Sequence, residues 1–169
     1  MKKVFYKNDF LEFAVENKKV KNKMVEIAEV IENDAVVILP ILNNKIIMEW
    51  QYRPALGKYI YEIPAGHIKN GENKKYAVIR ELEEETGYIA KRINKLLTFY
   101  SMPGISKMKT YVYIAKDLVK GKQNLDQDEI INIKFVTIDK ALQMIKSGNI
   151  KDEKTIIAIL FYLKFFRKE

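Results

Sequence analysis

A short acidic run is the part of the chain whose residue types and spacing could do chemistry. Residues 80–85 read Arg-Glu-Leu-Glu-Glu-Glu. On a helix, which turns by about 100° per residue, Glu81, Glu84 and Glu85 lie within an arc of about 100°. Glu83 points away from that arc. Like charges at this spacing repel one another, and the C-terminal end of a helix favours cations, so the pattern predicts a cation beside three carboxylates.

The composition limits what that cation can be. The chain has no cysteine and one histidine, His67, which excludes thiolate sites and sites of several histidines. Arg80 offers one positive charge, whereas a set of oxygen ligands favours Mg²⁺ or Mn²⁺ over zinc. Mg²⁺ held by few carboxylates keeps positions open for phosphate oxygens, which indicates phosphate chemistry. Taken alone, the run is more typical of an acidic helix end in solvent.

The surrounding residues favour the metal site. The segment from Gly66 to Tyr88 resembles the Nudix box, Gly-x5-Glu-x7-Arg-Glu-U-x-Glu-Glu-x-Gly-U, where U is a bulky aliphatic residue. The matching positions are Gly66, Glu72, Arg80, Glu81, Leu82, Glu84, Glu85 and Gly87. Tyr88 departs at the last position, where an apolar ring can still pack. The chain is thereby identified as a member of the Nudix hydrolase family.

The resemblance implies a set of metal ligands. Glu81, Glu85 and the backbone carbonyl of Ala65 are the expected ligands of Mg²⁺, for which Mn²⁺ could substitute, and Glu84 supports or joins them. Two or three ions are expected to act on the phosphates of the substrate. A carboxylate then orients or deprotonates the attacking water.

The resemblance also implies structural roles. Glu72 and Arg80 are expected to form the pair that fixes the helix against its entry loop, with Glu72 in the first helical turn. Gly66 permits a close backbone approach, and Gly87 ends the helix.

A second signature narrows the subgroup. Residues 51–53 (QYR) and 62–66 (EIPAG) look like the signature of ADP-ribose pyrophosphatases and related nucleotide-sugar hydrolases, and residues 152–155 resemble the start of their C-terminal helix. The similarity therefore covers nearly the whole chain. Arg53 is implied to contact the diphosphate, and Glu62 to lie near the metal and the nucleotide. Taken alone, Arg53 is more typical of a surface ion pair.

One loop departs from this subgroup, whose loop reads S-P-G-x-S-x-E and supplies a glutamate that helps to activate water. Gly104 is implied to lie at the substrate, but Met108 stands at the acidic position, and a thioether cannot accept a proton. Glu84, Glu85 and Glu129 are then the catalytic candidates, with Glu84 and Glu129 considered for the role of base. Otherwise the substrate differs or the activity is weak.

Three other features have simpler interpretations. His67 matches no catalytic position of the family and is expected to be a loop residue. Lys107 is expected to face solvent, with contact to a phosphate as the alternative. Apolar residues surround the helix at 161–166, which favours core or dimer packing over membrane contact.

The implied function is Mg²⁺-dependent hydrolysis of the diphosphate bond of a nucleotide sugar, with ADP-ribose giving AMP and ribose 5-phosphate. A hydrolase of GDP-mannose or another nucleotide sugar is the first alternative. A nucleotide-binding sensor that has lost turnover is the second, favoured by Met108 and opposed by the retained glutamates. A hydrolase of RNA caps or polyphosphate ends suits the net charge of +8, but no appended RNA-binding segment is visible.

The elements that must position these residues follow from hydrophobic patterning. Short strands are predicted at Val4–Tyr6, Phe10–Val15 and Lys23–Ile31, with polar punctuation that includes residues 16–19. Further strands are predicted at 35–42, 45–52, 91–100, 109–115 and 130–136. Helices are predicted before Gly87, over 139–147 with Asp139 as N-cap, and over 152–166.

These elements predict an α+β protein with the Nudix fold, a mixed β-sheet sandwiched between helices (α/β/α), and a small N-terminal antiparallel β-sheet. Residues 1–34 are expected to form a dimerisation subdomain exchanged across a homodimer, and residues 35–169 the Nudix hydrolase domain. A chain of 169 residues, 48% of them hydrophobic, can build such a core.

The expected partner is a small nucleotide sugar, without nucleic acid or membrane. Lysines are scattered along the chain, which is typical of a solvated surface. The longest apolar run, at 156–163, is far shorter than the roughly 20 residues of a bilayer span. No targeting segment is visible, so a cytoplasmic protein is expected.

Overall fold

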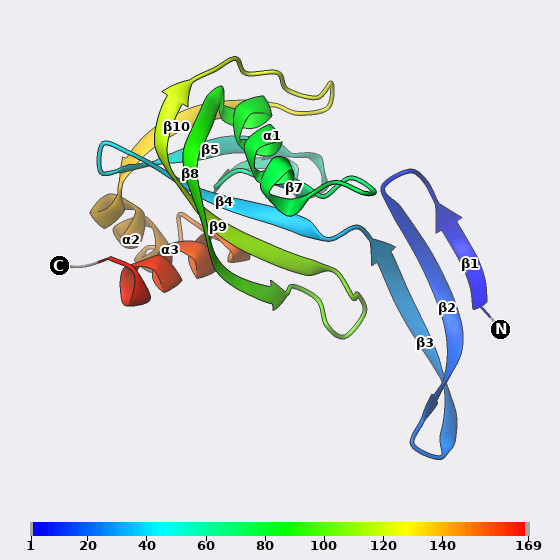
Figure 1. Cartoon of the computed structure of the whole chain (residues 1–169). Coiled ribbons are helices and arrows are strands. Elements are labelled where there is room, and N and C mark those ends of the chain that lie inside the picture. Colours follow the sequence, from blue (N-terminus) through cyan, green and yellow to red (C-terminus); the bar gives the residue numbers. More distant parts are fainter. Residues whose placement is uncertain (1, 168–169) are drawn as a thin grey trace.

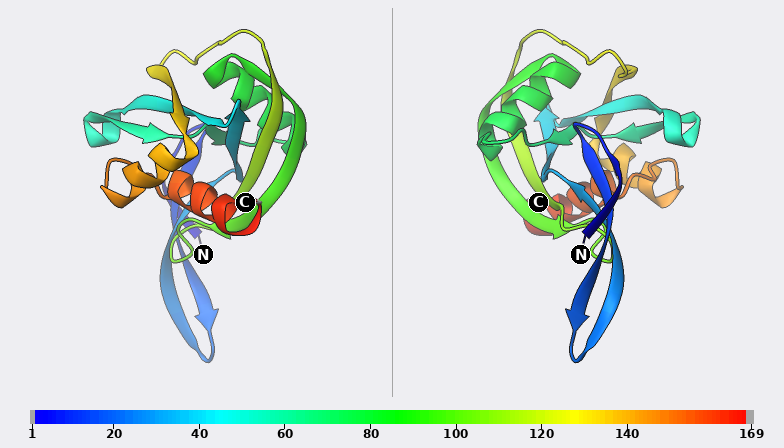
Figure 2. Two further views of the ribbon diagram at one scale, coloured as in Figure 1. Left: turned by 90° about the vertical axis from the view of Figure 1, so that its left-hand side faces the viewer. Right: turned by 90° about the vertical axis from the view of Figure 1, so that its right-hand side faces the viewer.

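The computed structural model describes residues 2–167, which form two sheets and three α-helices. The N-terminal sheet is antiparallel and contains β1 (Lys2–Lys7), β2 (Leu11–Val20) and β3 (Lys23–Glu32) in that order. It projects from the rest of the molecule (Figure 1), and both views in Figure 2 show the β2–β3 hairpin reaching away from the other elements. The small N-terminal antiparallel sheet that the sequence predicts is therefore present.

The second sheet carries the remaining strands. These are β4 (Ala35–Leu42), β5 (Lys45–Arg53), β6 (Lys58–Glu62), β7 (Ala65–His67), β8 (Tyr88–Tyr100), β9 (Lys109–Lys120) and β10 (Ile131–Thr137). The strand order is β10-β5-β4-β9-β8, with β6 paired to β5 and β7 paired to β4. The β4–β9 pair is parallel and the other pairs are antiparallel, so the sheet is mixed.

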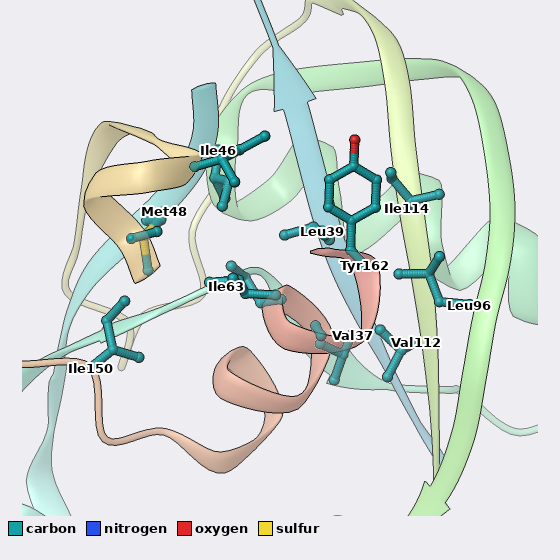
Figure 3. Close-up of a cluster of buried hydrophobic side chains, with 14 of the residues drawn as sticks. Val37, Leu39, Ile46, Met48, Ile63, Leu96, Val112, Ile114, Ile150 and Tyr162 are labelled. Carbon is teal, nitrogen blue, oxygen red and sulfur yellow. The ribbon is translucent and has the colours of Figure 1, made fainter. Parts of the chain in front are cut away.

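Helices cover both faces of this sheet. Val37 and Leu39 of β4 pack in one cluster with α2 (Ile138–Lys146) and α3 (Glu153–Phe165), part of which Figure 3 shows. Val36 and Ile38 point the other way and pack with α1 (Lys74–Thr86). Because side chains alternate along a strand, burial of both faces requires the unbroken apolar run of β4. The predicted α/β/α layering is confirmed.

Two helix starts differ from prediction. Asn73 caps α1 by accepting a hydrogen bond from the backbone N–H two residues later, so Glu72 lies before the helix and not in its first turn. Thr137, and not Asp139, caps α2. Ile138 is buried as the first residue of this helix, so the cap is the residue before it, Thr137. Asp139 then lies in the first turn, where its negative charge stabilises the helix.

Two further differences concern the segment between β5 and β7 and the length of β2. Hydrophobic patterning predicts no element between residues 53 and 65, whereas the chain forms a short 3₁₀ turn at Pro54–Leu56 and strands β6 and β7. Strand β2 also continues through residues 16–19, which pair with β3 as far as the turn at Lys21. Pairing with a neighbouring strand decides both cases, and local patterning carries little of that information.

Helix α3 contributes Ala158, Ile159 and Tyr162 to the core, which confirms core packing for part of the apolar tail. Among residues 2–167, no helix has both the length and the apolar character needed to cross a membrane.

Candidate active site

A cavity of about 680 Å³ opens beside α1 and β5. Segments far apart in sequence line it. Among its lining residues are Gln51, Arg53, Ala65, Gly66, His67, Arg80, Glu81, Glu84, Met108, Asp126, Glu129 and Lys154. The wall thus combines cationic side chains with carboxylates, which is the combination that a phosphorylated substrate and a divalent cation need.

Strand β7 and helix α1 meet at Gly66 and Glu81. A Cβ placed on Gly66 would overlap the carboxylate of Glu81. Only glycine therefore allows the helix to place this side chain against the backbone of β7. The close approach that the sequence predicts for Gly66 is confirmed, and its neighbour is the expected metal ligand.

Arg80 binds three glutamates of the Nudix segment, Glu72, Glu81 and Glu84. It donates to both carboxylate oxygens of Glu72, from Nε at 2.8 Å and from Nη2 at 2.9 Å. It also donates from Nη1 to Glu81 at 2.7 Å and to Glu84 at 3.0 Å, and from Nη2 to the carbonyl of His67 at 3.1 Å. The Arg80 guanidinium holds the pKa of Glu72 below its usual range. The predicted pair is confirmed, although Arg80 holds two further glutamates.

Among residues 2–167, the buried carboxyls of Glu85 and Glu49 have no cationic side-chain partner. The carboxylate of Glu85 accepts a hydrogen bond from the N–H of Ala65 at 2.9 Å, and burial followed by the charge of Glu49 raises its pKa well above the ordinary value. Glu49 is 1% exposed, and burial followed by the charge of Glu62 raises its pKa to about 8. For Glu81, burial raises the pKa and Arg80 opposes the rise.

Arg53 lies at the cavity with Glu62 behind it. The guanidinium donates to both carboxylate oxygens of Glu62, from Nε at 2.6 Å and from Nη2 at 2.8 Å. Lys154 Nζ approaches Glu62 at 3.5 Å, and its side chain also lines the cavity. Glu62 is buried and does not line the cavity. It therefore orients Arg53 and sits behind the position expected for the substrate.

Lys154 is positioned by the start of α3. Asp152 caps the helix by accepting from the N–H of Thr155 at 2.9 Å and from its hydroxyl at 2.7 Å. The hydroxyl of Thr155 in turn accepts from the backbone N–H of Ile63 at 3.0 Å. These contacts fix the helix start to Ile63, directly after the end of β6, and bring Lys154 beside Glu62.

The loop at residues 101–108, whose sequence differs from the subgroup's pattern, contacts both the cavity and the N-terminal sheet. Met108 lines the cavity, whereas Gly104 does not. The carbonyl of Ile105 accepts from the N–H of Val30 at 2.8 Å, which fixes the loop to β3. The Lys107 side chain is 82% exposed, as predicted, and lies near Glu29. The structure therefore does not bring Gly104 to the cavity.

The candidate bases differ in their neighbours. Glu129 lines the cavity and accepts a backbone N–H from Asp126 at 2.9 Å, and burial raises its pKa. Glu84 also lines the cavity but is held by Arg80. His67 is half exposed and lies 3.7 Å from Glu32. The prediction of a loop residue is wrong, because His67 is the last residue of β7 and pairs with Ala35 of β4.

Glu49 and Lys154 are the site residues that the sequence analysis missed. Alternation along β5 was the available signal, because Glu49, Gln51 and Arg53 share one face of that strand. For Lys154, only the helix start was noted. Within residues 2–167, no three Asp, Glu or His side chains converge as a formed metal cluster. Arg80 holds two of the expected ligand residues, so the assignment of metal ligands stays a prediction.

Comparison with known proteins shows to which family the chain belongs. Residues 32–158 match the NUDIX domain. The chain is 35% identical over 164 residues to an ADP-ribose pyrophosphatase of Bacillus subtilis (strain 168), covering 95% of this chain and 89% of the relative. It is 44% identical over 131 residues to a methanol dehydrogenase activator of Bacillus methanolicus, covering 75% and 70%.

A solved structure shows the same fold. The crystal structure of an ADP compounds hydrolase matches 98% of this chain and 91% of its own, with a TM-score of 0.83 at 18% identity. The chain belongs to the NUDIX family. The prediction of a Nudix hydrolase, made from the box and the second signature, is confirmed.

Proposed function

We propose that the protein hydrolyses the diphosphate bond of ADP-ribose, giving AMP and ribose 5-phosphate. One observation carries this proposal: a single cavity is lined both by the cations Arg53 and Lys154 and by the carboxylates Glu81 and Glu84. Cations bind a diphosphate, and carboxylates serve metal binding and proton transfer. The relative from Bacillus subtilis, which covers nearly the whole chain, is an ADP-ribose pyrophosphatase, and this supports the same substrate.

A divalent cation fits the site, and we propose Mg²⁺, with Mn²⁺ as a substitute. The donors are oxygens, which these ions prefer. Glu81, Glu84, Glu85 and the carbonyl of Ala65 would hold the ion, and the buried Glu85 carboxyl has no cationic partner among the described side chains. Family members generally use divalent ions. When bound, the ion would polarise phosphate oxygens.

Other side chains at the cavity bind the diphosphate and accept the proton from water. Arg53, oriented by Glu62, binds the diphosphate, and Lys154 adds a second positive charge at the same cavity. Among the candidate bases we favour Glu129, because Arg80 already occupies Glu84. Burial raises the pKa of Glu129, which increases its capacity to accept a proton near neutral pH.

We also propose that strands β1–β3 form a dimerisation subdomain. Their sheet exposes large apolar side chains: Val4, Phe5, Tyr6, Leu11, Phe13, Val20, Met24, Val25 and Ile31. Exposed apolar area of this kind is typical of protein interfaces. A second copy of the chain is the proposed partner.

One relative favours a second candidate function. The methanol dehydrogenase activator is named for its action on another enzyme. Together with Met108 at the cavity, this supports a protein that binds a nucleotide to regulate a partner, with little turnover.

The test is product analysis of the purified protein with ADP-ribose, in Mg²⁺, in Mn²⁺ and in EDTA. We expect AMP and ribose 5-phosphate with either metal and none in EDTA. GDP-mannose in a parallel reaction distinguishes the nucleotide-sugar alternative by release of GMP. A folded protein that binds ADP-ribose and releases no product would overturn the hydrolase and support the regulatory protein.

A further inference from the structure

The charges around the site do not balance. Glu62 is paired with Arg53 and Lys154, and Glu81 and Glu84 are paired with Arg80. Glu85 and Glu49 form no ion pair with any described side chain. Two buried carboxylates without a cation are strongly unfavourable, so they require protons or a positive ion.

Glu49 is the less satisfied of the two. Its Oε1 is fully buried and has no hydrogen-bond partner in the described part of the chain. The residue pairs with Glu62 across the β5–β6 ladder. The charge of Glu49 also raises the pKa of Glu85, so the two buried carboxyls are electrostatic neighbours. By alternation along β5, Glu49 lies on the strand face that also carries Arg53, although Glu49 itself does not line the cavity.

We infer that Glu49, a residue outside the Nudix box, binds the divalent cation together with Glu85. The inference rests on the proposed metal-dependent function and extends its ligand set to strand β5. Two carboxylates balance the charge of one divalent cation, and the orphaned Oε1 of Glu49 supplies a donor. Neither Glu49 nor Glu85 lines the cavity, so an ion that they bind would lie beneath the cavity wall. The loop at residues 101–108 brings Met108 to that wall, and a thioether is no ligand for Mg²⁺.

The test measures metal binding without substrate. The wild-type chain and its E49Q variant are titrated with Mn²⁺, followed by calorimetry and by electron paramagnetic resonance of the free ion. E85Q is the positive control. E83Q is the matched negative control, because Glu83 lies on the same acidic run but faces the loop at Gly121 and Lys122.

We expect E49Q and E85Q to raise the Kd for Mn²⁺ by about tenfold or more, and E83Q to leave it unchanged. Melting temperatures in EDTA provide the second readout. E49Q should melt at or above the wild-type temperature there, because it replaces a buried carboxyl without a cationic partner by a neutral amide. Addition of Mn²⁺ should then stabilise the wild type more than E49Q.

Each other result counts against the inference. Mn²⁺ binding that E49Q leaves unchanged, a wild type without measurable Mn²⁺ binding, or an E49Q chain that does not fold in EDTA would overturn it. Hydrolysis of ADP-ribose by the wild type is assayed in parallel. A wild type that binds Mn²⁺ through Glu49 but leaves ADP-ribose intact would remove the proposed function and retain the ligand.

Discussion

Arg53 and Glu62 form a two-point ion pair, with Nε 2.6 Å from Oε1 and Nη2 2.8 Å from Oε2. The carboxylate is buried, and the guanidinium reaches the cavity. Such a fork fixes the plane of the guanidinium as well as its position. The pair therefore holds Arg53 in one orientation, in which its guanidinium can bind an anion at the cavity.

Replacement of Arg53 should therefore weaken both binding and turnover of ADP-ribose. R53A removes a charged hydrogen-bond donor, for which we expect a loss of about 2 kcal/mol, or roughly 30-fold in kcat/KM. R53K keeps the charge but loses the fork, so it should recover only part of that loss. Steady-state kinetics of AMP release provide the measurement. K107A is the control, since the Lys107 side chain is 82% exposed outside the cavity, and equal losses in both variants would contradict the assignment.

A methyl group at Gly66 should displace Glu81. The G66A side chain would overlap that carboxylate, and the end of a flexible side chain can shift at little cost, so we expect little loss of unfolding free energy but weaker Mn²⁺ binding. Denaturant unfolding and Mn²⁺ titration test this. G104A is matched to it, because a Cβ there meets nothing within 4 Å. Unchanged stability with a raised KM in G104A would indicate that Gly104 contacts substrate.

Neutralising the acidic helix face should abolish most hydrolysis. E81Q and E85Q each remove a proposed metal ligand, and we expect activity to fall by about 100-fold or more. E83Q carries the same chemical change on the opposite side of α1, where its carboxylate faces Lys122. It should retain wild-type activity. The rate of AMP release at saturating Mg²⁺ provides the measurement, and undiminished turnover by E81Q or E85Q would refute the metal site.

Local features of the Nudix segment could be predicted from the sequence. Gly87 ends α1 in a left-handed conformation with φ of 72°, and Glu72 pairs with Arg80. Residues close in sequence decide both features, so a motif is sufficient to specify them. The unbroken apolar run of β4 likewise reports burial on both faces, which fixes its place in the centre of the sheet.

Features that depend on distant segments could not be predicted. Lys154 reaches the cavity only because Thr155 ties α3 to Ile63, directly after the end of β6. Glu49 was overlooked because a glutamate in a strand is ordinarily solvated, and its burial becomes visible only when β5 is paired on both sides. Arg80 donates hydrogen bonds to both Glu81 and Glu84, and this depends on side-chain geometry that the spacing of the residues in the sequence does not determine.

Charges placed on the N-terminal sheet should prevent the proposed dimer. Phe5 and Phe13 lie with ring centroids 5.9 Å apart and are both exposed. The double variant F5E/F13E should elute as a monomer, since burial of two carboxylates in an interface is unfavourable. Light scattering after size exclusion gives the mass. Y76E serves as the control, because Tyr76 is also an exposed aromatic residue but lies on α1. A monomeric wild type would contradict the dimer.

The buried carboxyls should make the metal-free protein less stable as pH rises. Burial raises the pKa of Glu49 from 4.5 to about 8, so between these values the folded chain holds a proton that the unfolded chain has released. Unfolding free energy then falls as pH increases from about 5 to 8. Urea unfolding in EDTA tests this. E49Q should show a smaller fall, because glutamine carries no proton to lose, and Mg²⁺ should stabilise the wild type most at the alkaline end, where both carboxyls are free to bind it. A wild-type stability that rises across this range in EDTA would show that Glu49 and Glu85 are ionised with partners, and that their burial does not create the need for a cation.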